Sequence, residues 1–237
     1  MDEQVQRLVD KAWTKFQQTP KDQRFMIAIG GIPGSGKTTL SQIVTQSLNA
    51  RHAAESSDAE PVAAYVPMDG YHLTRAQLSA MPDPVEAHAR RGAEFTFDGK
   101  AFLLLVKALR EPLTGSTETI HAPSFDHAVK DPKADDIPIH AHHRVVVFEG
   151  NYVCLRRGTW AEAAGLMDER WFVAVSDETA TARLVKRHVK AGIAKNEEEA
   201  LKRAKENDLV NGVEINGNKV DIDEEVRSKE DVSWKHD

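Results

Sequence analysis

A glycine-rich stretch at residues 31–38 constrains this chain more than any other part of its sequence. The residues Gly-Ile-Pro-Gly-Ser-Gly-Lys-Thr match the pattern G-x-x-x-x-G-K-[ST] at every fixed position, with an apolar run before it and a helical pattern after it. Gly34 and Gly36 allow the backbone to curl so that its N–H groups point inward and surround an anion. The helix that begins near Lys37 directs the positive end of its dipole at the same point. The stretch therefore predicts a phosphate-binding loop between a strand and a helix.

The side chains of this loop have separate roles in nucleotide binding. Lys37 supplies a mobile positive charge for the β and γ phosphates, and the Thr38 hydroxyl is placed to bind Mg²⁺. A phosphate loop predicts a nucleotide but no particular reaction, because kinases, hydrolases, switches and mechanical ATPases all use one. The expected nucleotide-binding residues are Gly31, Ile32, Pro33, Gly34, Ser35, Gly36, Lys37, Thr38 and Thr39.

Short apolar runs alternate with helical patterns along much of the chain. Strands that are apolar along their whole length suit a parallel sheet covered on both faces. Strands that alternate with helices are typical of a doubly wound α/β fold. We therefore expect a doubly wound α/β fold with a mainly parallel sheet. The apolar runs lie at residues 25–29, 62–66, 145–148 and 171–175, and the helical patterns at about 37–50, 99–110 and 178–191.

Several segments lie outside this alternation. An amphipathic helix is expected within residues 1–13. The polar stretch 71–98 is expected to be an acceptor-site insertion, residues 115–144 an irregular hairpin, and residues 183–211 the lid. The acidic tail after Val220 is expected to be loosely held.

Composition excludes several kinds of partner and compartment. The formal net charge is −6, whereas proteins that wrap a nucleic-acid backbone usually carry a basic excess, so nucleic acid is not expected. No apolar run approaches the roughly 18 residues of a membrane span, so no membrane partner is expected. Cys154 is the one cysteine, which rules out an intrachain disulfide and favours a reducing compartment. We expect a cytoplasmic protein.

Two carboxylates follow predicted strands where parallel sheets bind their ligands. Asp69 lies just after the second apolar run, and Glu149 ends the third. Because ligands of doubly wound sheets bind beyond the carboxyl ends of the strands, both side chains are expected near the phosphate loop. Asp69 can accept a proton from an attacking hydroxyl or hold Mg²⁺, and Glu149 can join the Mg²⁺ shell in a Walker-B arrangement.

A helix rich in cations is predicted after the fourth apolar run. Arg183 and Arg187 are four residues apart and share one face of it. Such a face can stabilise the charge of a transferred phosphoryl group and exclude water. The alternative is a solvated basic surface, which is usual for surface helices.

Stretches of sequence along most of the chain resemble the phosphoribulokinase/uridine kinase family, which includes bacterial-type pantothenate kinase and nicotinamide riboside kinase. The strings Phe-Asp-His at 125–127 and Glu-Gly-Asn-Tyr at 149–152 are similar to a branch of bacterial and fungal kinase-like proteins, often called fructose-transport or ATP-dependent kinases. The matching stretches are residues 31–39, 68–72, 91–98, 122–132, 148–152, 183–188 and 207–211.

This resemblance implies a single P-loop kinase domain over residues 1–237, with a mainly parallel sheet and a helical lid. It also implies roles for the matching residues. It implies that Asp69 is the general base toward the acceptor hydroxyl, that Lys37, Thr38 and Glu149 surround ATP with Mg²⁺, and that Arg183 and Arg187 are lid residues. One departure is that Ala-Glu-Phe stands at residues 93–95, where the family often has Pro before the acidic residue, which affects the shape of the acceptor loop. The implied acceptor pocket is lined by Tyr71, His72, Arg91, Phe125, Asp126, His127, Asn151 and Tyr152.

These features together predict a small-molecule kinase that transfers the γ-phosphoryl group of ATP to a hydroxyl of a metabolite. A nucleoside or riboside, a pantothenate-like acid and a sugar all fit as acceptors. Two alternatives stay open: a P-loop ATPase or nucleotide switch without a small-molecule acceptor, and a binding module without activity. The intact Lys37, Thr38, Asp69 and Glu149 argue against the inactive module. A homodimer is compatible with the family resemblance, although no residue pattern requires one.

Three smaller features carry no functional prediction. The histidines at 140, 142 and 143 lack a zinc spacing and are expected in a solvent-facing loop. Cys154 is expected to be a buried, inert thiol. The Arg90-Arg91 pair either grips an anionic acceptor or is solvated, and solvation is the more common state of such a pair.

Overall fold

The structure is a computed structural model that describes residues 3–55, 60–126 and 128–229. Its centre is a five-stranded sheet in the order β2–β5–β1–β6–β7, and every pairing in it is parallel. This arrangement confirms the expected α/β fold with a parallel sheet. The strands are β1 (Phe25–Gly31), β2 (Ala63–Pro67), β5 (Val145–Gly150), β6 (Glu169–Ala174) and β7 (Glu224–Arg227).

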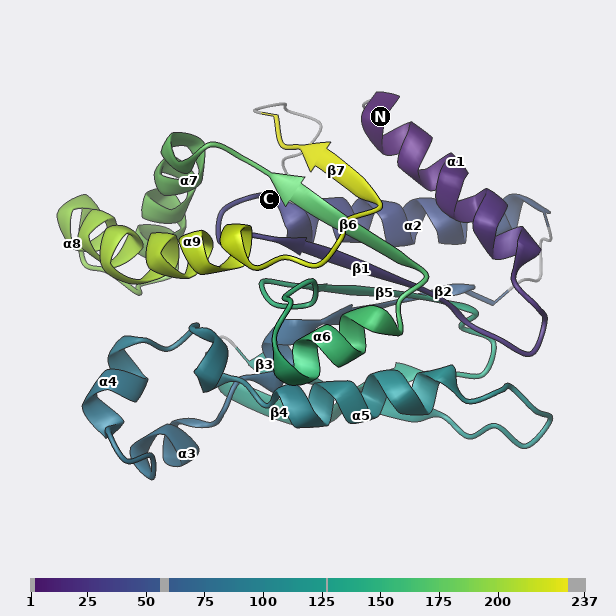
Figure 1. Ribbon diagram of the computed structural model, residues 1–237, viewed down its shortest axis with the longest axis horizontal. Helices are drawn as coiled ribbons and strands as arrows, with labels where there is room; N and C mark the ends of the chain where they lie inside the picture. Colours follow the sequence, from purple (N-terminus) through teal and green to yellow (C-terminus); the bar gives the residue numbers. More distant parts are fainter. Residues whose placement is uncertain (1–2, 56–59, 127, 230–237) are drawn as a thin grey trace.

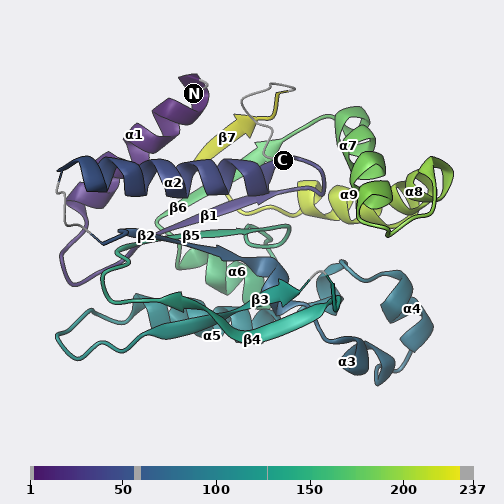
Figure 2. The same cartoon turned by 180° about the vertical axis from the view of Figure 1, so that it is seen from behind.

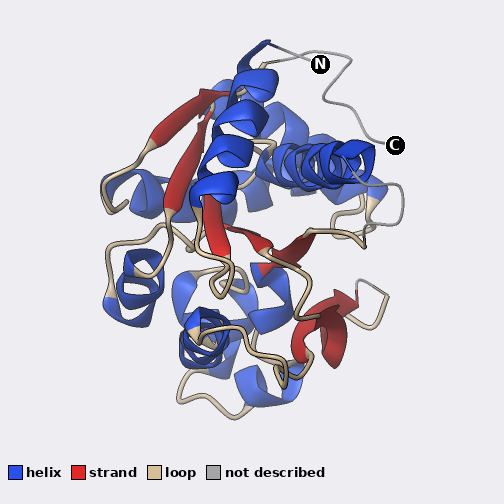
Figure 3. Cartoon of the chain, turned by 90° about the vertical axis from the view of Figure 1, so that its right-hand side faces the viewer, coloured by secondary structure: helices blue, strands red, loops and turns tan. Residues whose placement is uncertain are grey.

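Helices cover both faces of the sheet, which is layered between them (Figure 1, Figure 3). The helices α1 (Glu3–Gln18) and α2 (Lys37–Glu55) lie on one face, and α5 (Gly99–Arg110) and α6 (Gly158–Gly165) on the other (Figure 2). Successive residues of β1 alternate between the two layers: Ile27 packs with α1 and α2, whereas Met26 and Ala28 pack with α5 and α6. A strand covered on both sides is apolar throughout, which explains why the sequence shows runs here and no alternation. Within the described ranges, no helix combines the length and apolar character that crossing a bilayer requires.

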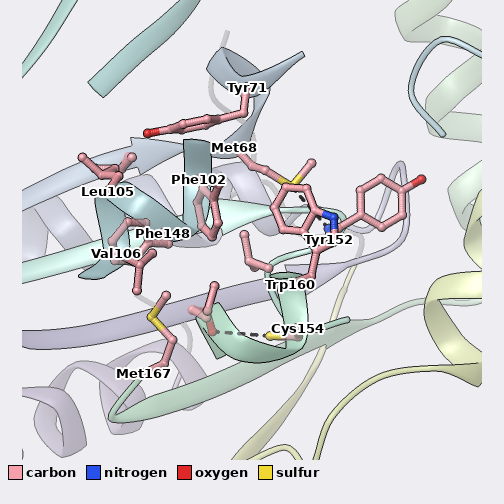
Figure 4. Close-up of a cluster of buried hydrophobic side chains, with 14 of the residues drawn as sticks. Met68, Tyr71, Phe102, Leu105, Val106, Phe148, Tyr152, Cys154, Trp160 and Met167 are labelled. Carbon is pink, nitrogen blue, oxygen red and sulfur yellow. Dashed lines mark hydrogen bonds between the residues drawn. The ribbon is translucent and has the colours of Figure 1, made fainter. Parts of the chain in front are cut away.

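The core cluster under α5 and α6 supports the turn that follows β2 (Figure 4). The ring of Phe102 on α5 lies 5.6 Å from that of Phe148 on β5 and 5.3 Å, edge-on, from that of Tyr71. Replacing such a buried ring with alanine costs about 3–5 kcal/mol. Cys154 belongs to the same cluster, so its expected burial is confirmed, and burial raises the pKa of its thiol to about 12.

The segments expected to be the acceptor-site insertion and the lid, hereafter the insertion and the lid, both project from the carboxyl end of the sheet (Figure 1). An antiparallel hairpin packs against η1 (Met68–Tyr71) and α5, and a register shift between Ala122 and Ser124 makes it irregular. The expected insertion, residues 71–98, begins at the end of η1 and contains α3 (Arg75–Ser79), α4 (Pro84–Ala89) and η2 (Glu94–Thr96). The hairpin consists of β3 (Ile120–Asp126) and β4 (Asp131–Ile139). The expected lid, residues 183–211, lies within α7 (Asp177–Lys190), α8 (Glu197–Arg203), the π-helix η3 (Ala204–Asp208) and α9 (Leu209–Gly217).

The chain after Val220 differs from the expected loose tail. Residues Glu224–Arg227 form the edge strand β7, parallel to β6. The side chain of Gln4 on α1 binds the backbone of Arg227 twice, since its Nε2 donates to the carbonyl and its Oε1 accepts from the N–H, each over 3.1 Å. Four residues that include two glutamates carry no strand signal, so this strand depends on contacts that a local pattern cannot reveal.

Candidate active site

The phosphate loop joins β1 to α2, as its motif predicts. Gly34 and Gly36 have φ angles of +80° and +91°, a left-handed conformation that favours glycine. A Cβ atom added at Gly34 would also lie 2.8 Å from the carbonyl oxygen of Ala180 on α7, so the loop and the lid pack directly together. Ser35 Oγ is buried and finds no hydrogen-bond partner in the described chain. An unpaired buried hydroxyl inside a curled glycine loop suits a cradle for an oxygen-rich anion.

Lys37 is buried at the start of α2, with 8% of its surface exposed. Its Nζ donates one long hydrogen bond, 3.4 Å, to the carbonyl of Ile32. Burial lowers the pKa of Lys37, Glu149 opposes that effect, and Arg187 adds to it. An ammonium group has three N–H donors, so a phosphate beside Nζ could accept the hydrogen bonds that the protein does not. The loop and Lys37 therefore fit a nucleoside triphosphate.

Glu149, at the end of β5, accepts hydrogen bonds from two hydroxyls. Thr38 Oγ1 donates to its Oε1 over 3.1 Å, and the hydroxyl of Tyr65 on β2 donates to its Oε2 over 2.8 Å. Burial raises the pKa of Glu149, which is 6% exposed, whereas Lys37 lowers it. A carboxylate and a hydroxyl beside a phosphate site are the oxygen donors that Mg²⁺ takes, together with waters and phosphate oxygens. Thr38 and Glu149 therefore fit Mg²⁺.

Asp69 lies in the turn η1 directly after β2, and its carboxylate is exposed. Its charge raises the pKa values of Lys37 and Glu149, so the structure brings these three groups into one cluster. Gly70 allows the turn to pack against the hairpin, since a Cβ there would lie 2.0 Å from the carbonyl oxygen of Pro123. The carboxylate of Asp69 therefore faces solvent from a turn that packs against the backbone of the hairpin.

The two lid arginines have different environments. Arg187 is exposed and near enough to Lys37 to lower its pKa. Arg183 instead binds the outer side of the phosphate loop: its Nη1 donates to the carbonyls of Gly34 at 3.2 Å and Ser35 at 3.3 Å, and to Ser228 Oγ at 2.8 Å. The expected contact of Arg183 with the transferred group is not what this conformation shows. The physical reason is that a loop with its N–H groups turned inward has its carbonyls turned outward, where they need a donor.

At the expected acceptor site, a stack of side chains connects the insertion to the hairpin. The ring of His72 lies 4.0 Å from that of Phe97 and 4.8 Å from that of Phe125, and its Nδ1 lies 2.8 Å from the carbonyl oxygen of Asp69. The stack therefore contacts the turn that carries Asp69. Asp126 turns the hairpin, because its Oδ1 accepts from the backbone N–H groups that follow it, at 2.8 and 3.0 Å.

Arg91 is occupied by the protein itself. Its guanidinium donates to the carbonyl of Lys130 at 2.6 Å, to the carbonyl of Leu73 at 3.1 Å and to Asp131 Oδ1 at 3.0 Å, and it lies over the ring of Phe125. Arg91 is therefore not solvated, and both of its Nη atoms bind groups of the protein itself. Arg91 fastens the insertion to the hairpin.

Two tyrosines after β2 and β5 that were expected to line the acceptor pocket lie deeper than that role implies. Tyr71 is 4% exposed, and Tyr152 is fully buried (Figure 4). The hydroxyl of Tyr152 donates to the carbonyl of Gly92 at 2.9 Å. Their rings belong to the core beneath the site, because strand ends and turns next to a sheet must cover its apolar face. Asn151 Oδ1 is buried and has no hydrogen-bond partner in the described ranges. The expected contact residue His127 lies outside the described residues.

The histidine cluster lies away from this site, in the turn between β4 and the amino end of β5. The side chain of His142 is exposed, whereas burial lowers the pKa of His143 to about 4. In the part of the chain that the structure describes, no three His, Cys, Asp or Glu side chains gather in a way that could hold a metal ion.

Several known proteins are similar to this chain. It is 54% identical over 159 residues to the "ATP-dependent kinase-like protein notR'" of Aspergillus versicolor, covering 67% of this chain and 92% of that protein. It is 37% identical over 201 residues to the "Putative uridine kinase C227.14" of Schizosaccharomyces pombe, covering 85% and 82%. The crystal structure of a "putative fructose transport system kinase" from Silicibacter sp. TM1040 superposes with a TM-score of 0.76 and 30% identity, over 92% of this chain and 98% of that one.

These similarities agree with the motifs. Residues 26–198, from the first strand to the start of α8, match the family described as "Phosphoribulokinase / Uridine kinase family". The match includes the phosphate loop, Asp69, Glu149 and both lid arginines, and it confirms the resemblance seen in the sequence. The chain belongs to the phosphoribulokinase/uridine kinase family of ATP-dependent kinases.

Proposed function

We propose that this protein is a small-molecule kinase that transfers the γ-phosphoryl group of ATP to a hydroxyl group of a metabolite. The observation that carries the proposal is the position of Asp69: an exposed carboxylate, on a turn that rests on the hairpin, beside the cluster of Lys37, Glu149 and Thr38. An exposed carboxylate at this place suits a base that must reach a second substrate. A hydrolase or switch has no such need for an acceptor insertion next to its base.

Each residue of the cluster has a role in this reaction. The loop N–H groups and Lys37 hold the phosphates, and Thr38 and Glu149 hold Mg²⁺, which supplies charge neutralisation to the phosphate oxygens when bound. Asp69 accepts the proton of the acceptor hydroxyl, and the exposed Arg187 adds positive charge beside the transferred group. Catalysis then consists of positioning and electrostatic stabilisation, as phosphoryl transfer generally requires.

The polar groups left open on the acceptor side favour a neutral polyhydroxy compound. The buried Oδ1 of Asn151 can accept a hydrogen bond from a second hydroxyl of the acceptor. Both Nη atoms of Arg91 are directed at groups of the protein itself, which favours an acceptor without a carboxylate or phosphate. Nucleosides and ribosides are therefore the first acceptors to test, which agrees with the name of the relative from Schizosaccharomyces pombe, followed by sugars and pantothenate-like acids.

The test is ADP release from ATP and Mg²⁺ across a panel of nucleosides, ribosides, sugars and hydroxy acids, with a control that has no acceptor. Release with one compound class supports the kinase and names its acceptor. Equal release in every well supports an ATPase or switch, and silence throughout supports a binding module.

The residue-level test is Asp69→Asn. We expect transfer to fall by about 10²–10⁴-fold, the usual contribution of general-base catalysis, while a fluorescent ATP analogue still binds. Asp10→Asn, an exposed change on α1, serves as the control. Full transfer activity in Asp69→Asn would remove this carboxylate from the role of base.

A further inference from the structure

Arg90, at the end of α4, reaches across to the lid. Its Nε donates to Asn207 Oδ1 over 3.0 Å, and its Nη2 donates to Asn211 Oδ1 over 2.7 Å. Asn207 returns a bond, since its Nδ2 donates to the carbonyl of Arg91 over 3.1 Å. Both asparagines are buried, with 5% and 1% of their surface exposed. Three hydrogen bonds therefore connect the acceptor-site insertion to the lid, where a solvated arginine or an anion grip was expected.

The lid segment that binds Arg90 also contacts the phosphate side of the site. Asp208, next to Asn207 in the π-helix η3, lies 2.9 Å through its Oδ2 from Nε2 of His188 on α7, and its charge raises the pKa of Lys37. Gly212 on α9 packs against the phosphate loop, where an added Cβ would lie 3.5 Å from the Cβ of Ile32. Residues 207–212 thus contact the nucleotide side and the acceptor side together. Single π-turns of this kind occur frequently at functional sites.

A triphosphate in the loop would act on this segment directly. In the structure, Lys37 is balanced by the carboxylates of Asp69, Glu149 and Asp208. A triphosphate would place new negative charge beside Asp208 and next to Arg187, so the position of the lid changes the energy of the bound nucleotide. A ligand shifts a conformational equilibrium only through such a difference in interaction. The hydrogen bonds of Arg90 extend that difference to the insertion, because they form only when the lid lies close enough for Arg90 to reach Asn207 and Asn211.

We propose that Arg90 is a positioning residue that couples nucleotide binding at the phosphate loop to the ordering of the acceptor-site insertion, through Asn207 and Asn211. The inference rests on the proposed function in one respect, namely that the loop binds a nucleoside triphosphate. It gives the lid a second role besides stabilising charge: the acceptor side becomes ordered when the nucleotide is in place.

The test is hydrogen–deuterium exchange on the full chain, with and without Mg²⁺ and a non-hydrolysable ATP analogue. In the wild type, we expect the nucleotide to slow exchange in residues 73–97 by about fivefold or more, the lower range of coupling between sites. In Arg90→Ala and in Asn211→Ala, we expect the analogue to bind within about twofold of wild-type affinity and to protect the loop, while exchange in the insertion changes by less than about twofold.

Two further variants separate coupling from general packing. Arg75→Ala removes another arginine of the insertion, one that pairs with Asp131 of the hairpin at 3.3 Å, and should leave the coupling intact. Arg90→Lys keeps the charge but lacks the fork that reaches two amide oxygens, so it should retain only part of the coupling.

Three results would overturn the proposal. One is an insertion that responds to the nucleotide in Arg90→Ala as it does in the wild type. Another is a wild-type insertion that does not respond. The third is loss of analogue binding in both Arg90→Ala and Asn211→Ala, because these side chains would then serve folding or binding itself. A silent acceptor screen would leave the coupling unaffected, so the two proposals fail separately.

Discussion

The hydroxyl of Tyr65 donates a 2.8 Å hydrogen bond to Oε2 of Glu149, across the neighbouring strands β2 and β5. Thr38 occupies the other carboxylate oxygen, so the side chain of Glu149 is oriented from both sides. Burial raises the pKa of the Tyr65 hydroxyl, and the nearby Glu149 charge raises it further, so Tyr65 remains a donor. The orientation of this carboxylate therefore depends on a tyrosine that no motif includes.

Tyr65→Phe removes this donor and keeps the ring. Because groups that orient a metal-binding carboxylate commonly contribute 10–100-fold to metal affinity, we expect the Mg²⁺ concentration for half-maximal binding of an ATP analogue to rise by about tenfold. The measurement is a Mg²⁺ titration followed by the fluorescence of the analogue. Affinity for the analogue in excess EDTA serves as the control and should be unchanged. An unchanged Mg²⁺ requirement would mean that Tyr65 does not act on the metal site.

Gly70→Ala tests whether the hairpin supports the turn that carries Asp69. The added Cβ would lie 2.0 Å from the backbone carbonyl oxygen of Pro123, which cannot move as a flexible side chain would. We expect a loss of about 1–3 kcal/mol in the free energy of unfolding, measured with urea, as for other overpacked sites. The transfer rate should also fall at temperatures where the variant is fully folded, because Asp69 is the preceding residue.

Gly165→Ala is the matched control, since a Cβ there meets no atom within 4 Å and the residue ends α6. It should leave the transfer rate unchanged and stabilise the helix by a fraction of about 1 kcal/mol. Equal unfolding curves and rates for the two alanine variants would contradict the proposed support from the hairpin.

Local patterns predict much of this fold. Burial on both faces makes central strands apolar, so β1 and β5 are visible as runs, and the helix expected at residues 99–110 begins and ends as predicted. The side chain of Asp98 caps that helix by accepting from the N–H of Ala101 at 2.9 Å, which is a short-range interaction. The glycines of the phosphate loop are equally local, since their conformation is left-handed.

What the sequence could not predict depends on contacts between distant segments. Tyr65 is one more apolar residue in its run until β2 is placed beside β5. Arg183 lies on the predicted cationic face, but only the packing of α7 on the loop shows that its guanidinium binds backbone carbonyls. Arg90 resembles any arginine of a polar loop. Its partners Asn207 and Asn211 lie in a stretch that resembles the family, but the sequence does not show that this stretch contacts Arg90.

The edge strand β7 carries a glutamate that forms ion pairs with α1. Glu224 accepts hydrogen bonds from Arg7 and Lys11 of α1, both over 2.8 Å. The bond from Arg7 is the main cause that lowers the pKa of Glu224 to about 2, against a usual value of 4.5; burial opposes it and Lys11 adds to it. Because the carboxylate is more acidic in the folded state, its charged form stabilises the fold above pH 4.5. That contribution is lost as the pH falls toward about 2.

Glu224→Gln removes the charge and keeps the shape of the side chain. We expect the free energy of unfolding at pH 7 to fall by about 1 kcal/mol, the upper range for an accessible ion pair, and the difference from wild type to shrink between about pH 5 and about pH 2. Urea denaturation at several pH values measures both effects. Glu225→Gln changes the adjacent exposed carboxylate of the same strand and should reproduce neither. A difference between Glu224→Gln and wild type that stays constant over this pH range would show that the ion pairs with α1 do not hold β7 in the sheet.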